Sequence, residues 1–313
     1  HKVVTLHEVI AVPAQTLDKS ADALPVMNQG QVLTLPGWDA RQVWLKINTA
    51  ALEPGTWKTI VHLRTLEVET QSFDIPLTIE VSGVKLGDTD VLRHCNWGYV
   101  AGSRLKNHEP QAIADRVAHG NNVFVSTFLP RATYDEQGNL TGEIDYAAHD
   151  TFIGKYAPNG LILFQNYNPI TTTAPLDSEA YKKAYVHYVR EWVKHLATLG
   201  VGYDGFAMYP IDEPGLTDGL VKMYLHNAKL TREADPKILM YTDPVARITE
   251  EELREMSPYV DIWCPNRVGF LLNVGAEKLK IMQADPGAIL WNYECLGNAK
   301  HQSPLGYYRA QAW

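Results

Sequence analysis

Cysteine is scarce in this sequence, and the cysteines it has show no metal-binding spacing. Of 313 residues only 3 are cysteines, namely Cys95, Cys264 and Cys295. Three cysteines so far apart predict no disulfide framework, and no CxxC pair is present to hold zinc. Each follows an apolar run that predicts a strand, so we expect thiols that are buried or lie beside a site.

The sequence also lacks an excess of positive charge. It has 28 Lys and Arg against 36 Asp and Glu, which gives a formal net charge of -8. Nucleic acids and anionic membrane surfaces are bound through basic patches, so this balance argues against both as partners. No apolar run is long enough to insert through a bilayer, and the basic-then-apolar pattern of a signal peptide is missing.

The first residue is His1 rather than Met. We therefore expect that an upstream segment has been removed, which slightly favours a secreted or periplasmic protein. The compartment and the oligomeric state stay open.

Several motifs of common enzyme classes are missing. No GxGxxG or GxxxxGK[ST] occurs where a strand meets a helix, which weakens a nucleotide-binding interpretation. The absence of GxSxG argues against an α/β-hydrolase esterase, and the 11 histidines include no HExxH pair. We therefore expect no cofactor and no metal.

The first quarter of the chain is rich in strand-like runs and shows no convincing helix. Residues 42–48 and 73–81 partly alternate apolar with polar side chains, which is typical of strands with one wet face. We predict an antiparallel β-sandwich over residues 1–87, joined to the rest by a linker near residues 82–89. Its strands are expected at residues 3–12, 31–35, 42–48, 57–66 and 73–81.

From residue 88 to 313 the pattern changes to strands that alternate with helices. The clearest helix is expected over residues 178–199, where aromatic and leucine side chains recur at steps of three and four. Thr249 and Glu252 have the spacing of a capping box that opens another helix. Such a series predicts a (β/α)8 TIM barrel in preference to an open doubly wound sheet. The expected strands are residues 91–97, 122–128, 161–166, 205–211, 238–242, 260–264 and 288–293. Because these are seven, we expect either a barrel that lacks its last strand and is truncated at the C-terminus, or that one of these strand assignments is wrong.

Two adjacent acids, Asp212 and Glu213, directly follow the buried strand expected at residues 205–211. In a barrel, chemistry gathers where the strands end. Neighbouring carboxylates raise one another's pKa, so that one keeps its proton near neutral pH. A protonated acid beside an ionised carboxylate is what cleavage of a glycosidic bond requires. We therefore predict that these two residues are catalytic. The segment that they begin, DEPG (212–215), would also suit a solvated turn.

Aromatic, amide and charged side chains follow the other expected strands. Flat rings can support the C–H faces of a sugar, while amides and acids pair with its hydroxyl groups. The predicted substrate-binding residues are His94, Trp97, Asn166, Tyr209, Asp243, Trp263, Arg267, Trp291, Tyr293 and Glu294.

The order of a sandwich, a barrel and the segments YPIDEP (209–214) and WNYEC (291–295), with Tyr308, Arg309 and Trp313 beyond them, resembles glycoside hydrolase family 123. The resemblance spans nearly the whole chain and rests on these short motifs. It implies an exo-acting β-N-acetylgalactosaminidase that uses substrate-assisted catalysis. By position, Glu213 would be the general acid/base, and Asp212 would orient the substrate's 2-acetamido group. Tyr293 or Tyr209 would then bind the acetamido oxygen.

Two alternatives remain open. In the first, Glu294 is the nucleophile of a retaining glycosidase whose acid/base is Glu213, with the two carboxyl groups about 5–5.5 Å apart. Such enzymes usually have Asn before the acid/base, whereas this chain has Asp212, and Glu294 could instead pair with Arg267. In the second, the chain is a non-catalytic carbohydrate-binding protein, because a fold does not prove turnover. The sequence does not distinguish GalNAc from GlcNAc, and it leaves the linkage and the natural glycan open.

Overall fold

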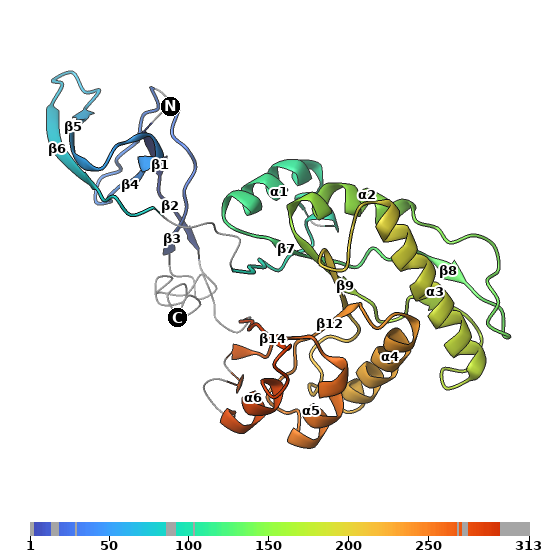
Figure 1. Ribbon diagram of the computed structural model, residues 1–313. Coiled ribbons are helices and arrows are strands. Elements are labelled where there is room, and N and C mark those ends of the chain that lie inside the picture. Colours follow the sequence, from blue (N-terminus) through green and yellow to red (C-terminus); the bar gives the residue numbers. More distant parts are fainter. Residues whose placement is uncertain are drawn as a thin grey trace. The chain divides into compact units, whose positions relative to one another are not determined.

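The computed structural model describes residues 3–13, 19–28, 30–85, 92–102, 104–267, 269–270 and 275–294 (Figure 1). The chain divides into two compact units, and the described residues up to 85 belong to the first and those from 92 onward to the second. Cys295 and the residues of the family resemblance that follow WNYEC, Tyr308, Arg309 and Trp313, lie outside the described residues. No described helix has the length and hydropathy of a membrane span.

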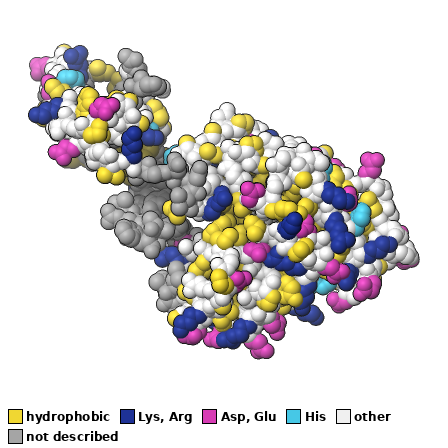
Figure 2. All heavy atoms as spheres, viewed as in Figure 1, with side chains coloured by type: hydrophobic (Ala, Val, Ile, Leu, Met, Phe, Trp, Pro, Cys, Tyr) yellow, Lys and Arg dark blue, Asp and Glu magenta, His cyan; other side chains and the backbone are white. Residues whose placement is uncertain are grey.

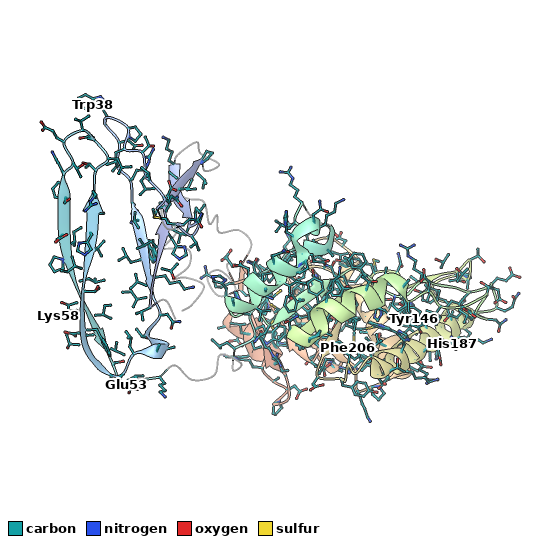
Figure 3. The ribbon with its side chains drawn as sticks, turned by 90° about the horizontal axis from the view of Figure 1, so that it is seen from above. Trp38, Glu53, Lys58, Tyr146, His187 and Phe206 are labelled. Carbon is teal, nitrogen blue, oxygen red and sulfur yellow. The ribbon has the colours of Figure 1, made fainter. Side chains whose placement is uncertain are left out.

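The described strands of the first unit form antiparallel pairs. β1 pairs with β4, β2 with β3, and β5 with β6 in a hairpin of ten residue pairs. The bounds are β1 (Val4–Glu8), β2 (Ile10–Pro13), β3 (Lys19–Ala23), β4 (Val43–Ile47), η1 (Thr49–Ala51), β5 (Gly55–Arg64) and β6 (Ser72–Val81). Trp38 and Glu53 lie at opposite ends of this unit (Figure 3).

The expected sandwich is not confirmed, because the described strands form three separate two-stranded sheets. Many apolar side chains on them remain exposed, including Trp57 and Phe73. The strand expected at residues 31–35 is wrong, since that segment is irregular, and β3 was not predicted. β3 has the sequence KSADA, whose only apolar side chains are two small alanines, and it is a strand because it pairs with β2.

The second unit is built on a six-stranded parallel sheet whose spatial order, β7-β9-β11-β12-β13-β14, follows the chain. A doubly wound sheet would reverse its strand order part-way, so the sequential order favours barrel-type winding. In the described sheet, β7 and β14 are edges and do not pair with each other. The bounds are β7 (Val123–Ser126), β9 (Leu161–Gln165), β11 (Phe206–Tyr209), β12 (Leu239–Thr242), β13 (Ile262–Trp263) and β14 (Ile289–Leu290), with β8 (Ala132–Thr133) and β10 (Ile170–Thr171) as a separate pair.

The first of the seven strands expected for the barrel is not a strand over the residues described, 92–97. Side chains of the two residues that precede β7, Asn121 and Asn122, hold this segment beside the start of that strand. The backbone N–H of His94 donates to Asn122 Oδ1 over 2.9 Å, and Asn122 Nδ2 donates to the carbonyl of Leu92 over 2.8 Å. A strand would require successive backbone hydrogen bonds to its neighbour. The segment does lie next to β7, but it lacks the regular backbone pairing of a strand.

Helices separate the successive strands of the parallel sheet, as the alternating pattern predicts (Figure 1). The predicted helix at residues 178–199 is confirmed as α3, which begins where Ser178 Oγ accepts the N–H of Tyr181. The Thr249–Glu252 capping box is also confirmed. The bounds are η3 (Val100–Gly102), η4 (Lys106–His108), α1 (Glu109–Ala118), α2 (Ala147–Tyr156), η5 (Ala157–Asn159), α3 (Glu179–Thr198), α4 (Leu220–Ala234), α5 (Glu250–Met256), η6 (Ser257–Tyr259) and α6 (Ala276–Met282).

The two faces of the parallel sheet belong to two different apolar clusters. Successive side chains of a strand point to opposite faces. Met208 and Trp263 pack with the helices in the larger cluster, while Tyr209 and Cys264 join the smaller one on the other face. Acidic and basic side chains are interspersed over the visible surface of this unit (Figure 2). The sheet therefore has a helix-covered face and an inner face.

Candidate active site

The loop after β11 carries the two predicted catalytic acids in an unusual backbone conformation. Glu213 has φ of 48°, in the left-handed region that non-glycine residues rarely adopt. Gly215 follows at φ of 93°, and a Cβ there would lie 2.8 Å from the backbone nitrogen of Ile248. The loop is tied to the next one, because Val245 N–H donates to the carbonyl of Pro214 over 3.1 Å. Strain of this kind persists where surrounding contacts fix it, and it clusters at functional sites.

The carboxylates of Asp212 and Glu213 are each held by a tyrosine hydroxyl. Tyr209 at the end of β11 donates to Asp212 Oδ1, and Tyr293 donates to Glu213 Oε1. Both tyrosines belong to the apolar cluster of the inner face. Asp212 is exposed, whereas Glu213 is half-buried. The two acids are thus directed toward hydroxyl groups on the same face of the sheet.

A third acid, Asp243, lies behind this pair. Its side chain follows β12 and is 4% exposed. Asp243 Oδ2 lies 2.6 Å from the hydroxyl of Tyr209, and Asp243 Oδ1 accepts the backbone N–H of Glu213 over 3.0 Å. Asp243 therefore fixes both the tyrosine that holds Asp212 and the strained backbone of Glu213.

Burial dominates the electrostatics of this cluster. It raises the pKa of Asp243 well above the usual range of a carboxyl, and the nearby Asp212 charge raises it further. Burial likewise raises the pKa of the Tyr209 and Tyr293 hydroxyls above the usual range. Both hydroxyls consequently keep their protons and act as hydrogen-bond donors to the carboxylates.

Two tryptophans pack against tyrosines of the inner face. Trp97 stands edge-on to Tyr209 with ring centroids 5.8 Å apart, and 41% of it is exposed. Trp291 is half-buried and contacts Tyr241, with ring centroids 6.0 Å apart. Trp97 and Trp291 are therefore the two predicted tryptophans that contact the tyrosines of the inner face.

A chain of amide and hydroxyl groups that we did not predict borders Trp97. Trp97 Nε1 donates to the hydroxyl of Tyr99 over 3.2 Å, and that hydroxyl donates to Gln165 Oε1 over 3.1 Å. Gln165 also lies 3.5 Å from the hydroxyl of Tyr167, which is hydrogen-bonded to the backbone of Asp212. The signal available in the sequence was that Gln165 and Tyr167 sit two residues apart at a strand end and so share a face.

Three of the predicted substrate-binding residues lie away from the acids. Asn166 is fully buried on the helix side, where its Nδ2 lies 3.4 Å from the hydroxyl of Tyr185. Trp263 is 1% exposed and belongs to the helix-side cluster. The backbone of His94 bonds to the residues that start β7, at the opposite end of the strands from Asp212. We therefore leave all three out of the site.

Arg267 and Glu294 pair with each other. Arg267 Nη2 lies 2.9 Å from Glu294 Oε2, and the Glu294 side chain is 1% exposed. An attacking carboxylate must reach the anomeric carbon of a substrate. A buried carboxylate held by a guanidinium suits a structural ion pair better, as one of the sequence alternatives foresaw.

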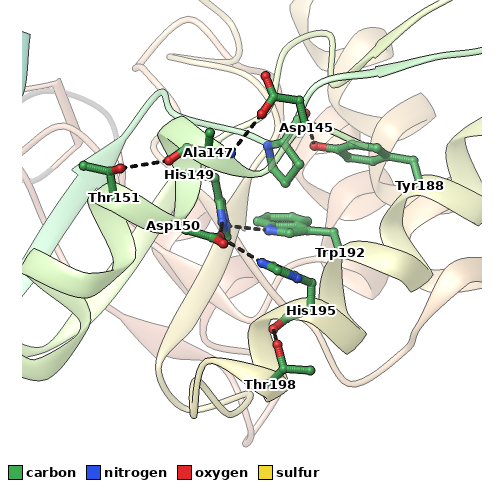
Figure 4. Close-up of polar contacts among 10 residues, drawn as sticks. Asp145, Ala147, His149, Asp150, Thr151, Tyr188, Trp192, His195 and Thr198 are labelled. Carbon is green, nitrogen blue, oxygen red and sulfur yellow. Dashed lines mark hydrogen bonds and ion pairs between the residues drawn. The ribbon is translucent and has the colours of Figure 1, made fainter. Parts of the chain in front are cut away.

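Among the described residues, one group of His, Cys, Asp and Glu has metal-like proximity, formed by His149, Asp150 and His195 (Figure 4). Trp192 Nε1, which can only donate, lies 2.9 Å from His149 Nε2. His149 Nε2 is therefore the acceptor, and Nδ1 carries the proton that bonds to Asp150 over 2.9 Å. Burial lowers the pKa of His149, which keeps the ring neutral.

A metal would need the lone pair of His149 Nδ1, and the indole would then lose its acceptor. His195 donates from Nε2 to the same Asp150 oxygen over 2.8 Å. The cluster therefore fastens α2 to α3 through one carboxylate shared by two imidazoles. The histidine spacing in the sequence gave no signal for it.

Comparison with known proteins identifies no family. No family model and no curated protein matches this chain. Among solved structures, it is similar to a β-1,4-D-mannanase from Cryptopygus antarcticus, with 9% identity over 66% of this chain and 83% of that one and a TM-score of 0.37. It is similar to the xylanase TsXylA from Thermoanaerobacterium saccharolyticum, with 10% identity over 66% and 76% and a TM-score of 0.41. It is also similar to a putative α-L-fucosidase from Bacteroides thetaiotaomicron, with 12% identity over 71% and 88% and a TM-score of 0.34. At TM-scores this low, we draw no conclusion from these likenesses about activity or substrate.

Proposed function

We propose that the second unit is a glycosidase that removes a terminal β-linked N-acetylhexosamine by substrate-assisted, retaining catalysis. The observation that carries this proposal is the pair of adjacent acids, Asp212 and Glu213, each hydrogen-bonded to its own tyrosine on the inner face. Two crowded carboxyl groups held by dedicated donors are costly for a protein to keep and are typical of acid/base sites.

The chemistry assigns one role to each acid. Glu213 donates a proton to the leaving glycosidic oxygen while the carbonyl oxygen of the substrate's 2-acetamido group attacks the anomeric carbon. Asp212 accepts the acetamido N–H and stabilises the cationic oxazolinium ion that forms. Water then opens this ion, and Glu213 takes up the proton of that water, which regenerates the acid. No enzyme nucleophile is needed, as in the substrate-assisted exceptions to the two-carboxylate scheme.

The surrounding side chains suit a saccharide. Trp97 and Trp291 offer apolar ring surface next to the tyrosines of the inner face, and the exposed Tyr99 and Tyr167 offer hydroxyl groups that can pair with those of a sugar. The resemblance of the two short motifs to glycoside hydrolase family 123 favours GalNAc over GlcNAc.

A panel of three aryl glycosides tests the mechanism. The protein should hydrolyse aryl β-N-acetylgalactosaminide and leave the matching β-galactoside nearly intact, because the galactoside lacks the attacking acetamido group. A thiazoline that mimics the oxazoline should inhibit. Aryl β-N-acetylglucosaminide reports the preference at the 4-hydroxyl. Equal turnover of the galactoside would overturn acetamido assistance.

Variants locate the chemistry. Glu213→Gln should lower kcat by about 10²–10⁴-fold, because it removes the acid/base. Asp212→Asn should lower it by about 10²–10³-fold, because the cation loses its counter-charge. Asp218→Asn is the matched control, since this exposed acid of the same segment loses the same charge. A similar loss in all three variants would indicate a general effect of charge.

Glu294→Gln addresses the direct-attack alternative. Because the Glu294 carboxylate is buried and held by Arg267, this change should lower thermal stability while the folded protein keeps most of its kcat. Loss of nearly all activity in a folded variant would instead assign Glu294 as nucleophile. Saccharide binding without any hydrolysis would favour the non-catalytic alternative.

A further inference from the structure

We propose that Asp243 holds a proton while Asp212 is ionised, so that Asp243, Tyr209 and Asp212 form a hydrogen-bonded chain with one direction. Its effect on catalysis rests on the proposed function, whereas the position of the proton does not. Asp243 is then a positioning residue that acts on Asp212 through Tyr209.

The first step is a count of hydrogens. The Tyr209 hydroxyl has one hydrogen, yet its oxygen contacts Asp212 Oδ1 and lies 2.6 Å from Asp243 Oδ2. The single hydroxyl hydrogen cannot bond to both carboxylates. If both Asp212 and Asp243 were ionised, the carboxylate oxygen without that hydrogen would face the lone pairs of the Tyr209 oxygen. One of the two carboxyl groups must therefore donate to Tyr209.

The second step is to decide which carboxyl carries the extra proton. Asp243 is 4% exposed, whereas Asp212 is exposed and its charge is hydrated. A buried carboxylate pays the cost of desolvation, so the proton belongs on Asp243. The chain then runs from the Asp243 carboxyl to the Tyr209 oxygen, and from the Tyr209 hydroxyl to the Asp212 carboxylate.

The neighbouring groups agree with this assignment. Burial raises the pKa of the tyrosines and of the thiol that face Asp243, so they are uncharged near neutral pH, and Asp212 carries a negative charge that also disfavours ionisation of Asp243. The groups facing Asp243 are Tyr167 after β9, Tyr209 at the end of β11, Asp212 in the loop after β11, Tyr224 of α4, Tyr241 of β12, Cys264 after β13 and Tyr293 after β14.

The second oxygen of Asp243 fits the same state. Asp243 Oδ1 accepts the backbone N–H of Glu213 over 3.0 Å, so it must keep a lone pair, while Oδ2 faces Tyr209 and carries the proton. An asparagine side chain offers the same arrangement, with its oxygen toward Glu213 and its NH₂ group toward Tyr209. Asp243→Asn therefore imitates the protonated acid. Asp212→Asn, in contrast, removes the negative charge that the proposed mechanism requires.

The carboxyl carbon of Asp243 tests the proposal directly. In protein labelled with ¹³C at the aspartate carboxyls, the resonance that disappears in Asp243→Asn belongs to Asp243. We expect this resonance to have the shift of a protonated carboxyl near pH 7 and to stay there on acidification to about pH 4, where ordinary aspartates titrate. A carboxylate shift near pH 7 would overturn the proposal. The measurement needs no activity, so it decides even if no glycoside is cleaved.

Kinetics add a second test. Asp243→Asn should lower kcat by less than about tenfold, whereas Asp243→Ala should lower it by about 10²-fold, because it removes the donor that orients Tyr209. The alkaline limb due to ionisation of Asp243 should be absent from the pH profile of Asp243→Asn. Equal losses in Asn and Ala variants of confirmed folding would refute the direction of the chain.

Discussion

The proton on Asp243 has a thermodynamic signature that Asp243→Asn should reveal. The folded protein keeps this proton because burial raises the pKa of the carboxyl well above its usual range. The unfolded chain releases it as pH rises through about 4. Since the folded state then binds more protons than the unfolded state, wild-type stability falls as pH rises from about 4 toward the folded pKa. Asparagine has no proton to release, so the variant escapes this loss.

The size of the effect follows from one proton. A difference of one bound proton changes the free energy of unfolding by about 1.4 kcal/mol per pH unit. Between about pH 4.5 and 6.5 the stability of Asp243→Asn relative to wild type should therefore grow by up to about 2.7 kcal/mol. For a unit of roughly 200 residues this corresponds to a relative rise in Tm of about 5–10 °C. The bonds to Glu213 N–H and Tyr209 persist in the variant, so they largely cancel from the comparison.

Thermal unfolding and hydrogen exchange measure this difference. Because the chain has two units, a single melting curve mixes their transitions. Exchange in peptides from β11 and β12 reports the second unit alone. The free energy of unfolding of Asp243→Asn should be compared with that of wild type at each pH of the series. Asp218→Asn is the exposed control, and its stability relative to wild type should change little with pH. A stability difference that stays constant or shrinks as pH rises would refute the reasoning.

Three further predictions concern the backbone near the acids and the cluster of His149, Asp150 and His195. Gly215→Ala should lower stability by about 1–3 kcal/mol and also lower activity, because its Cβ meets the backbone of the next loop. Gly219→Ala, at φ of 89° with open space, should cost only about 1 kcal/mol, which paired thermal melts can check. Glu213→Asn should be inactive yet more stable than Glu213→Gln by about 0.5 kcal/mol, since Asn tolerates left-handed backbone; equal Tm values would contradict this. Trp192→Phe should destabilise by about 1–3 kcal/mol because His149 Nε2 loses its donor, and added zinc should leave the wild-type Tm unchanged.

Periodicity predicted the elements whose contacts are local. The helix α3 was found because its Tyr and Trp side chains recur on one face, and its buried positions include Tyr185, Tyr188 and Trp192. The segment 31–35, QVLTL, is rich in residues that favour strands but is irregular in the structure. β3 shows the converse, since pairing with β2 makes a strand of a segment whose only apolar side chains are two small alanines. Strand pairing depends on a distant partner, which the local sequence does not name.

The strand ends were identified from the sequence, but the face that each residue occupies was not. Asp212, Glu213 and Tyr293 were predicted to lie together. Tyr293 is bonded to Glu213, and Asp212 is linked to the backbone of Glu213 through Tyr209 and Asp243. Asn166 and Trp263 were chosen as partners, yet each points into the helix-side core. A shift of one residue along a strand exchanges its faces, so Gln165 rather than Asn166 lies beside Tyr99.

The alternation of faces along β11 to β13 also separates two kinds of sequence change. Replacements at Tyr209, Tyr241 or Cys264 would change the inner-face cluster, which includes the tyrosine that holds Asp212. Replacements at Met208 or Trp263 would disturb the packing of the helices against the other face of the sheet. A mutant library aimed at the surroundings of the acids should therefore vary the inner-face positions of these strands and keep Tyr209.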